Sequence, residues 1–433
     1  MFERWVKIFQ IAATYIGTVV GAGFASGQSI MQFFTVYGPV GAVGITITTF
    51  LFMWLGTKMM VVAHRIKAFS YQEFNEHLFG PVLGKLANAL TLLILLGVTA
   101  VMLSGTGSIF EEQLHLPYQI GIVLSIVLAY WVMTKEMNGI VVVNALVVPM
   151  MLLFTCLIAI NVVEPGGIMR ITEWQRQQLR DYGWALSAFV YVALNFAFAQ
   201  AVMVPLGSEV KEESTLKWGG FWGGIGLGAM LLTYHFAINA RMPEIMELEI
   251  PMAEIVRGLG ALPYVLFLLV IYGEIFTTLI GNVFGMTRQI QSLFSLPKNA
   301  VILAVLLACF LISQIGFASL LTYLYPLFGY IGMLLLALLA FRRLPQADGP
   351  PVDPPAEHFG LTGGPSIPFS AAPAYEQRTR DQQREGRLEN DVHFEAEAKP
   401  DLQVQKQGHF DQQAQIQQNR DKDIKPFDKD EMR

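Results

Sequence analysis

The chain has 433 residues, of which 53% are hydrophobic, and a mean hydropathy of +0.46; such values are typical of membrane proteins rather than soluble domains. From Leu344 onward it holds 11 Lys and Arg against 17 Asp and Glu, whereas the residues before Leu344 hold 18 against 17. A near-neutral body with an acidic tail excludes a nucleic-acid-binding protein, which requires a basic stripe. The two cysteines, Cys156 and Cys309, lie in apolar runs, so we expect packed free thiols and neither a disulfide framework nor a metal cluster.

Ten apolar runs are long enough to cross about 30 Å of hydrocarbon. They cover residues 5–34, 39–64, 82–109, 118–134, 138–161, 184–208, 216–239, 261–290, 299–314 and 317–341. An alternative interpretation of the first run is a cleaved secretory signal, since Arg4 and Lys7 precede apolar residues and small residues follow. Its removal would leave an odd number of spans, so we predict ten transmembrane helices.

The loop charges predict the orientation of these helices. If the N-terminus is cytoplasmic, the inside segments hold thirteen Lys and Arg and the outside segments hold five. This asymmetry favours a multi-pass protein with both termini in the cytoplasm. We predict a transmembrane domain over residues 1–343 and a disordered cytoplasmic tail over 344–433, because the tail is too polar to bury a core.

The ten spans divide into two halves of similar length, about 5–160 and 184–341. Since five is an odd number, the second half must enter the membrane from the opposite side, which predicts an inverted repeat. Each half has an unusually long third span, and each opens with an anomalous helix. Paired interruptions at matching positions are typical of the central binding site of a transporter. The alternative is ten unrelated helices whose glycines only permit close packing.

The first anomaly is the stretch from Ile16 to Ile30, IGTVVGAGFASGQSI, in which three glycines fall within seven residues. Irregular backbone at membrane depth is tolerated only where it is buried in protein or lines a polar cavity. We therefore expect a broken first helix whose freed N–H and C=O groups meet a small polar solute. The sixth span, with its own polar residues, is expected to be broken too and to form the opposite wall. The predicted solute-binding residues are Gly21, Ala22, Gly23, Phe24, Ser26, Gly27, Gln28, Asn195, Phe196 and Gln200.

The eighth span contains YGEIFTTLIGN, which places Glu274, Thr277 and Thr278 within one turn. An ionisable group in a membrane helix usually faces the bundle interior and marks an ion or proton path. The alternative is that the threonines bond back to the preceding turn and that Glu274 packs with a neighbour. In the tenth span, Tyr325 and Pro326 belong to a kinked, aromatic-lined helix, which either gates a pathway or simply packs. No nucleophile–base pair, phosphate loop or metal motif is present, so we do not expect an enzyme or a cofactor.

The run GTVVGAGFASGQ, the segment EIFTTLIGNVFG and the ten spans as 5+5 resemble the YkvI family of bacterial membrane proteins. That family is placed in the amino acid–polyamine–organocation superfamily, with the LeuT-type inverted-repeat fold. The resemblance covers residues 1–343 and implies a location in the bacterial plasma membrane. It also implies a sodium site formed by the carbonyls of Gly17 and Val20 and the hydroxyls of Thr277 and Thr278. Glu274 departs from the pattern, because the usual residue at its position is small, and this leaves protons open as the coupling ion.

We therefore expect an all-α secondary transporter that moves a small polar solute, an amino acid by preference, by alternating access coupled to sodium or protons. The alternative is a ligand-sensing receptor subunit on the same fold, like the germinant-receptor subunits, that binds solute without net transport. The expected partners are the solute and the lipid bilayer, with no nucleic acid, and the sequence does not indicate an oligomeric state.

Overall fold

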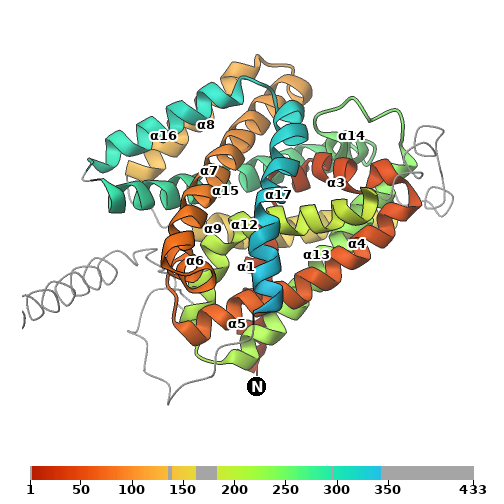
Figure 1. Cartoon of the computed structure of the whole chain (residues 1–433). Coiled ribbons are helices and arrows are strands. Elements are labelled where there is room, and N and C mark those ends of the chain that lie inside the picture. The colour runs from red at the N-terminus through yellow and green to blue at the C-terminus, as the bar shows by residue number, and fades with distance from the viewer. Residues whose placement is uncertain (1, 135–138, 162–182, 295, 343–433) are drawn as a thin grey trace, which may run out of the picture. The chain divides into compact units, whose positions relative to one another are not determined.

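The computed structural model describes residues 2–134, 139–161, 183–294 and 296–342, and within these ranges it contains helices and no strands (Figure 1). The helices of the first half are α1 (Phe2–Val19), α2 (Ala22–Ala25), α3 (Gln28–Phe33), α4 (Pro39–Leu51), α5 (Thr57–Ile66), α6 (Tyr71–Phe79), α7 (Pro81–Ser108), α8 (Tyr118–Thr134) and α9 (Gly139–Asn161). Short turns extend three of them: η1 (Thr35–Tyr37) follows α3, and the π turns η2 (Phe52–Gly56) and η3 (Ile109–Gln113) follow α4 and α7. The helices of the second half are α12 (Gly183–Glu209), α13 (Glu213–Ala240), α14 (Pro251–Arg257), α15 (Ala261–Leu293), α16 (Lys298–Ser313) and α17 (Phe317–Phe341).

Each of the ten apolar runs coincides with helix in the structure. Six helical segments of the described part are long and apolar enough to cross a membrane: Pro39–Ile66, Pro81–Gln113, Gly183–Glu209, Glu213–Ala240, Ala261–Gln291 and Phe317–Phe341. Three shorter apolar helices correspond to the fourth, fifth and ninth runs. The long third spans are confirmed, since Pro81–Gln113 and Ala261–Gln291 have 33 and 31 residues and the other four membrane-length segments have 25 to 28. The predicted tail, residues 344–433, lies outside the described residues.

The helix contacts repeat with an offset of five spans. The helix α1 packs on α13, and α12, at the matching place in the second half, packs on α4 and α5. The helix α7 contacts α8, α16 and α17, while its counterpart α15 contacts α16, α8 and α9. In the same way, α12 packs along α17 as α1 packs on α9 (Figure 1). Two halves of similar internal structure would produce this pattern.

The first helix is broken as the glycines predict, but the prediction of a broken sixth helix is wrong. The helix α12 runs without interruption from Gly183 to Glu209. Its polar side chains bond within the helix: Asn195 Nδ2 donates to the Tyr191 carbonyl at 2.7 Å, and Gln200 Nε2 donates to the Ala197 carbonyl at 2.9 Å. Because these bonds return to carbonyls of the preceding turn, the amides need no unwound backbone. The segment also has no glycine between its first residue and Gly207.

The uninterrupted α12 is also the most enclosed of the membrane-length helices. Within its most apolar window 78% of the residues are buried, against 39% for α17. The helix is therefore placed to carry residues of a central site on more than one face.

Candidate functional site

The break in the first helix frees backbone groups at the end of α1. The last bond of α1 is donated by the Val20 N–H to the Ile16 carbonyl, and the next backbone bond runs from the Ala25 N–H to Gly21. Within the described residues, the carbonyls of Gly17 and Val20 therefore receive no backbone hydrogen bond from the following turn. These are the two carbonyls that the family resemblance assigns to an ion, and the break leaves both available.

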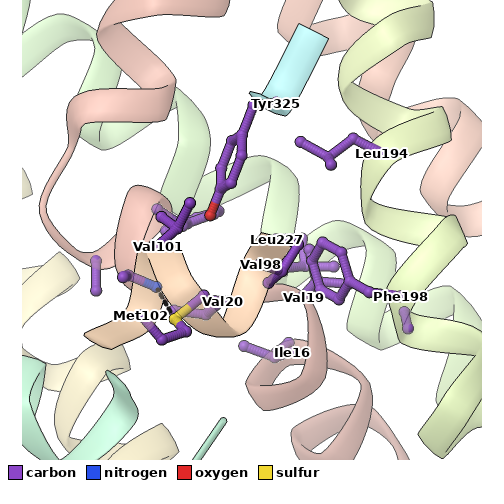
Figure 2. Packing of buried hydrophobic residues seen from close by; sticks show 14 of the residues in the cluster. Ile16, Val19, Val20, Val98, Val101, Met102, Leu194, Phe198, Leu227 and Tyr325 are labelled. Atoms are coloured by element: carbon purple, nitrogen blue, oxygen red, sulfur yellow. Dashed lines mark hydrogen bonds between the residues drawn. The ribbon is translucent and has the colours of Figure 1, made fainter. Parts of the chain in front are cut away.

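Met102 of α7 supports the break from the side. The Ala22 N–H donates to the Met102 sulfur at 3.3 Å, the contact that is drawn as a dashed line in Figure 2. A Cβ on Gly21 would lie 2.8 Å from the terminal methyl of Met102, so the end of the methionine side chain would have to shift to make room for it. Gly21 thus lets Met102 of another helix approach the backbone of the break closely.

A second interruption follows at Gly27, which has a φ of +85°, a conformation that favours glycine. The Ser26 hydroxyl donates to the Gly23 carbonyl at 3.3 Å and accepts from the Gln28 N–H at 3.2 Å, so its role here is to hold the turn. The Ser26 carbonyl accepts from the Met252 N–H at 3.0 Å, and a Cβ on Gly27 would lie 2.5 Å from Met252. The short helix α14 therefore packs directly on this part of the break.

A small cavity of about 10 Å³ lies between the break, α12 and α17. Its lining residues are Val19, Gly21, Phe24, Ser29, Tyr191, Asn195, Phe198 and Tyr325. Tyr191 lies beside Ser29 and Asn195 in this lining, and a Cβ on Gly23 would lie 2.9 Å from the Tyr325 ring. Figure 2 shows Tyr325 reaching from α17 toward the break, with Val19 and Phe198 close by. A volume of this size holds about one water molecule, so a larger solute requires these aromatic side chains to move.

The structure brings some of the predicted solute-binding residues together and separates others. Gly21 and Phe24 line the same cavity as Asn195. Phe196 faces elsewhere, with its ring centroid 5.8 Å from that of Phe52. Gln200 donates to the Thr91 hydroxyl at 3.1 Å and lines a different cavity, between α6, α7, α12 and α17. Ala22, Gly23, Ser26, Gly27 and Gln28 are buried in the break but do not line its cavity.

Five lining residues were not among the predicted solute-binding residues: Val19, Ser29, Tyr191, Phe198 and Tyr325. Ser29 directly follows Gln28, the last predicted binding residue of the first span, and Tyr191 lies one helical turn before Asn195, on the same face of α12. That spacing is a signal that the sequence offers for Tyr191. For Tyr325 the sequence shows only an aromatic helix, of which Tyr323 and Tyr330 prove to be 74% and 54% exposed.

Two glycines at or near the predicted ion-binding residues, one on α1 and one on α15, pack against α9. A Cβ on Gly17 would lie 2.6 Å from Val148, and one on Gly273 would lie 3.2 Å from Val147, so both glycines approach the same turn of α9. Thr277 is one turn beyond Gly273 on the same face of α15. In addition, α2 packs on α15. Gly17 and the turn of α15 from Gly273 to Thr277 therefore belong to one region of the bundle, where both pack on α9.

Within this region the Thr277 hydroxyl donates to the Glu274 carbonyl at 3.1 Å, as the alternative interpretation of the threonines predicts. Thr277 is buried, and Thr278 is partly exposed. The Glu274 side chain is 1% exposed, and neither carboxylate oxygen has a hydrogen-bond partner. A buried carboxylate without a partner is costly whether it is charged or neutral. Glu274 is therefore the described residue of this region that most needs a proton or a cation.

Two carboxylates fasten the segment that covers the break, residues 241–257. Glu112 in η3 accepts from the N–H groups of Glu249 and Ile250 at 2.9 and 3.0 Å. The Glu249 carboxylate in turn accepts from the Ser108 hydroxyl and from the Ala318 N–H. These bonds connect the covering segment to α7 and to the beginning of α17, so it cannot lift from the break without breaking them.

The chain was compared with known proteins. No protein-family model matches it. It is 39% identical over 337 residues to the uncharacterized membrane protein YkvI of Bacillus subtilis (strain 168), covering 78% of this chain and 96% of the relative. It is 26% identical over 329 residues to the uncharacterized protein YyaD of the same strain, covering 75% of this chain and 93% of the relative.

Solved structures show the same fold at low sequence identity. An inward-facing structure of Mhp1 matches with a TM-score of 0.53 and 14% identity over 77% of this chain and 75% of that chain. A mutant of the manganese transporter of Eremococcus coleocola matches with a TM-score of 0.51 and 14% identity, over 78% and 77%. The identity to YkvI and its coverage confirm the resemblance seen in the sequence: the chain belongs to the YkvI family of membrane proteins and has the LeuT fold of membrane transporters.

Proposed function

We propose that the protein is a secondary transporter that carries a small polar solute, by expectation an amino acid, across the bacterial plasma membrane by alternating access. The observation that supports this most directly is the broken first helix, whose freed backbone groups border a cavity in the middle of the bundle. Unpaired backbone at membrane depth is stabilised only by protein, by water or by a bound ligand. A discontinuous helix of this kind at the interface of two repeats is the usual substrate site of secondary transporters.

The offset of five spans in the helix contacts supports the inverted 5+5 architecture, because the contacts of α1 and α7 described above have counterparts made by α12 and α15. Alternating access in such folds is a movement of one part of the bundle against the other around a fixed site. The closed cavity is consistent with this mechanism, since Phe24, Phe198 and Tyr325 must move before a solute larger than water can bind. With both termini in the cytoplasm, α14 would cover the site from the outside.

We propose sodium as the coupling ion, bound by the carbonyls of Gly17 and Val20 and the hydroxyls of Thr277 and Thr278. Hard cations prefer oxygen ligands, and the break leaves both carbonyls without backbone partners. Glu274 would supply a compensating negative charge or, in the alternative, carry a proton itself. We do not propose manganese as a substrate, because a likeness to the manganese transporter at 14% identity shows the fold alone. The part of the chain that the structure describes also has no group of three or more His, Cys, Asp or Glu that could hold a metal ion.

The test begins with a thermal-shift screen of the purified full-length protein against amino acids, nucleobases and amines, in sodium chloride and in choline chloride. The stabilising solute is then radiolabelled, and its uptake is measured in proteoliposomes with an inward sodium gradient or a pH gradient. Accumulation that collapses when the gradient is dissipated is the expected result. Saturable binding without any accumulation would overturn transport and identify the ligand sensor.

A matched pair of variants tests whether the solute binds at the cavity beside the break. Asn195→Ala removes a side chain that lines the cavity beside Tyr191 and should weaken solute binding about tenfold, the value of one lost hydrogen bond. Thr233→Ala removes an exposed hydroxyl of α13 that bonds only to its own helix, and it should leave the affinity unchanged. Equal affinities in the two variants would place the solute site elsewhere.

A further inference from the structure

A second cavity of about 90 Å³ lies between α6, α7, α12 and α17, apart from the break. Its lining residues are Asn75, Phe79, Leu83, Leu86, Ala87, Leu90, Thr91, Ile94, Ala197, Gln200, Ile331, Gly332, Leu334 and Leu335. Three of them, Leu83, Leu86 and Leu334, are 58%, 57% and 60% exposed. Since apolar side chains are both part of the lining and open to the outside of the bundle, the cavity has its mouth toward the lipid.

Two residues of this lining, Gln200 and Asn75, each carry a buried amide oxygen without a partner. Gln200 is 1% exposed, and its Nε2 donates to Thr91 and to the Ala197 carbonyl, while its Oε1 has no hydrogen-bond partner. The orientation of this amide is fixed by Ala197, because exchanging nitrogen and oxygen would set two acceptors against each other. Asn75 is also 1% exposed; its Nδ2 donates to Asn88, and its Oδ1 has no partner. Buried acceptors of this kind are costly unless a donor reaches them.

The lining defines what that donor would be. It contains no acidic or basic side chain, so a charged head group would be buried without a counter-charge, which is strongly unfavourable. A neutral hydroxyl or amide N–H meets the two oxygens without that penalty. The volume corresponds to about three water molecules, which suits a small head group, and the leucines at the mouth continue as an apolar surface for an aliphatic chain.

We propose that this cavity is a binding site for a neutral amphiphile, whose hydroxyl-bearing head group donates to Gln200 and Asn75 while its alkyl chain leaves between α7 and α17 into the bilayer. The site does not depend on the proposed transport function. Gln200 lies five residues beyond Asn195 on α12, and the second cavity shares no lining residue with the cavity at the break.

The test uses a dodecanol analogue that carries a diazirine, with the full-length protein in phosphatidylcholine vesicles. After irradiation, labelled peptides are identified by mass spectrometry, in the presence of excess 1-dodecanol or of excess dodecane. We expect labelling on residues 83–94 or 331–335 that dodecanol competes away and dodecane does not. Gln200→Leu removes one acceptor. It should lower the ratio by which dodecanol competes with labelling more strongly than dodecane about fivefold to tenfold.

Two variants on α7 provide the matched control. Ala87→Phe places a ring in the cavity and should abolish the competed labelling. Ala89→Phe adds the same ring two residues away, at an exposed position that does not line the cavity, and should leave it unchanged. Labelling that is equal in both variants would overturn the site. Equal competition by dodecane would overturn recognition of the head group, and absence of labelling in folded wild-type protein would show that water satisfies the two oxygens.

Discussion

Removing the Glu274 carboxylate should stabilise the protein in the absence of a coupling ion. The side chain is 1% exposed and neither oxygen has a partner, whereas a typical buried polar group is hydrogen-bonded. An unsatisfied buried polar group costs about 1–3 kcal/mol in protein mutational data. Glu274→Leu keeps most of the volume and removes that cost, so we expect the free energy of unfolding to rise by about 1–3 kcal/mol. Glu274→Gln should give a smaller rise, because its amide is still polar.

The assay is thermal unfolding of the detergent-solubilised protein in choline chloride and again in sodium chloride. For a domain of this size, a gain of 1–3 kcal/mol raises the melting temperature by about 1–4 °C. Sodium should raise the melting temperature of the wild type more than that of the leucine variant. Glu254→Gln is the control, since its ion pair with Arg257 is 43% exposed on each side and contributes about 0–1 kcal/mol.

Two outcomes would refute this reasoning. A loss of more than about 2 kcal/mol in Glu274→Leu, of the size expected when a buried ion pair is broken, would show that the carboxylate has partners in the folded protein. An undiminished response to sodium in the leucine variant would show that Glu274 takes no part in binding the ion.

Three further predictions concern the break, its cover and the orientation. Gly23→Leu should abolish solute binding while the protein still inserts, because a Cβ there would lie 2.9 Å from the Tyr325 ring; wild-type binding of radiolabelled solute would contradict this. Glu112→Ala leaves two N–H groups of the covering segment without their acceptor and should lower the free energy of unfolding by about 1–3 kcal/mol, measured by thermal unfolding; no change in melting temperature would mean that water replaces the carboxylate. In a chain without native cysteines, a cysteine at Glu111 should react with an impermeant maleimide on intact cells, whereas one at Gln72 should react only after permeabilisation; the reverse pattern would invert the topology.

The position of the helix break could be predicted because glycine is a local signal. Gly21 and Gly27 stand at the two interruptions of the first span, one in extended backbone and one with a positive φ. The positive φ of Gly27 is a conformation that favours glycine over other residues, so this interruption follows from the residue type itself. The lengths of α7 and α15 could be predicted as well, because they follow from the lengths of the apolar runs.

Whether the sixth helix is broken could not be predicted in this way, because an amide side chain in an apolar helix satisfies its hydrogen bonds in one of two ways. Asn195 and Gln200 either require freed backbone or bond back within the helix, and the sequence is the same in both cases. The structure shows the second solution. Whether an amide reaches the cavity then depends on its angular position on α12, and this is why Asn195 lines the break while Gln200 faces α7.

The cover over the break was not predicted for a related reason. Its contacts join residues that are far apart in the chain: Met252 bonds to Ser26, and Glu112 bonds to Glu249 and Ile250. Nothing in the periodicity of residues 241–257 indicates which helix they will touch. Such long-range pairs depend on the packing of the whole bundle, and only the structure reveals them.

The last prediction separates the two coupling ions. Replacing Thr277 and Thr278 with valine keeps the shape of α15 nearly unchanged and removes two oxygens from the proposed sodium site. The lost back-bond from Thr277 to Glu274 is replaceable, since the carbonyl still takes part in the helix, so the fold should be retained. If sodium couples transport, sodium stimulation of uptake should collapse in this double variant, whereas the pH profile should persist. If Glu274 carries a proton instead, Glu274→Gln should lose the pH dependence, and any sodium dependence should survive. Uptake measured over sodium concentration and pH decides between them: full sodium stimulation in the double valine variant would refute the sodium site, and an unchanged pH profile in Glu274→Gln would refute the proton path.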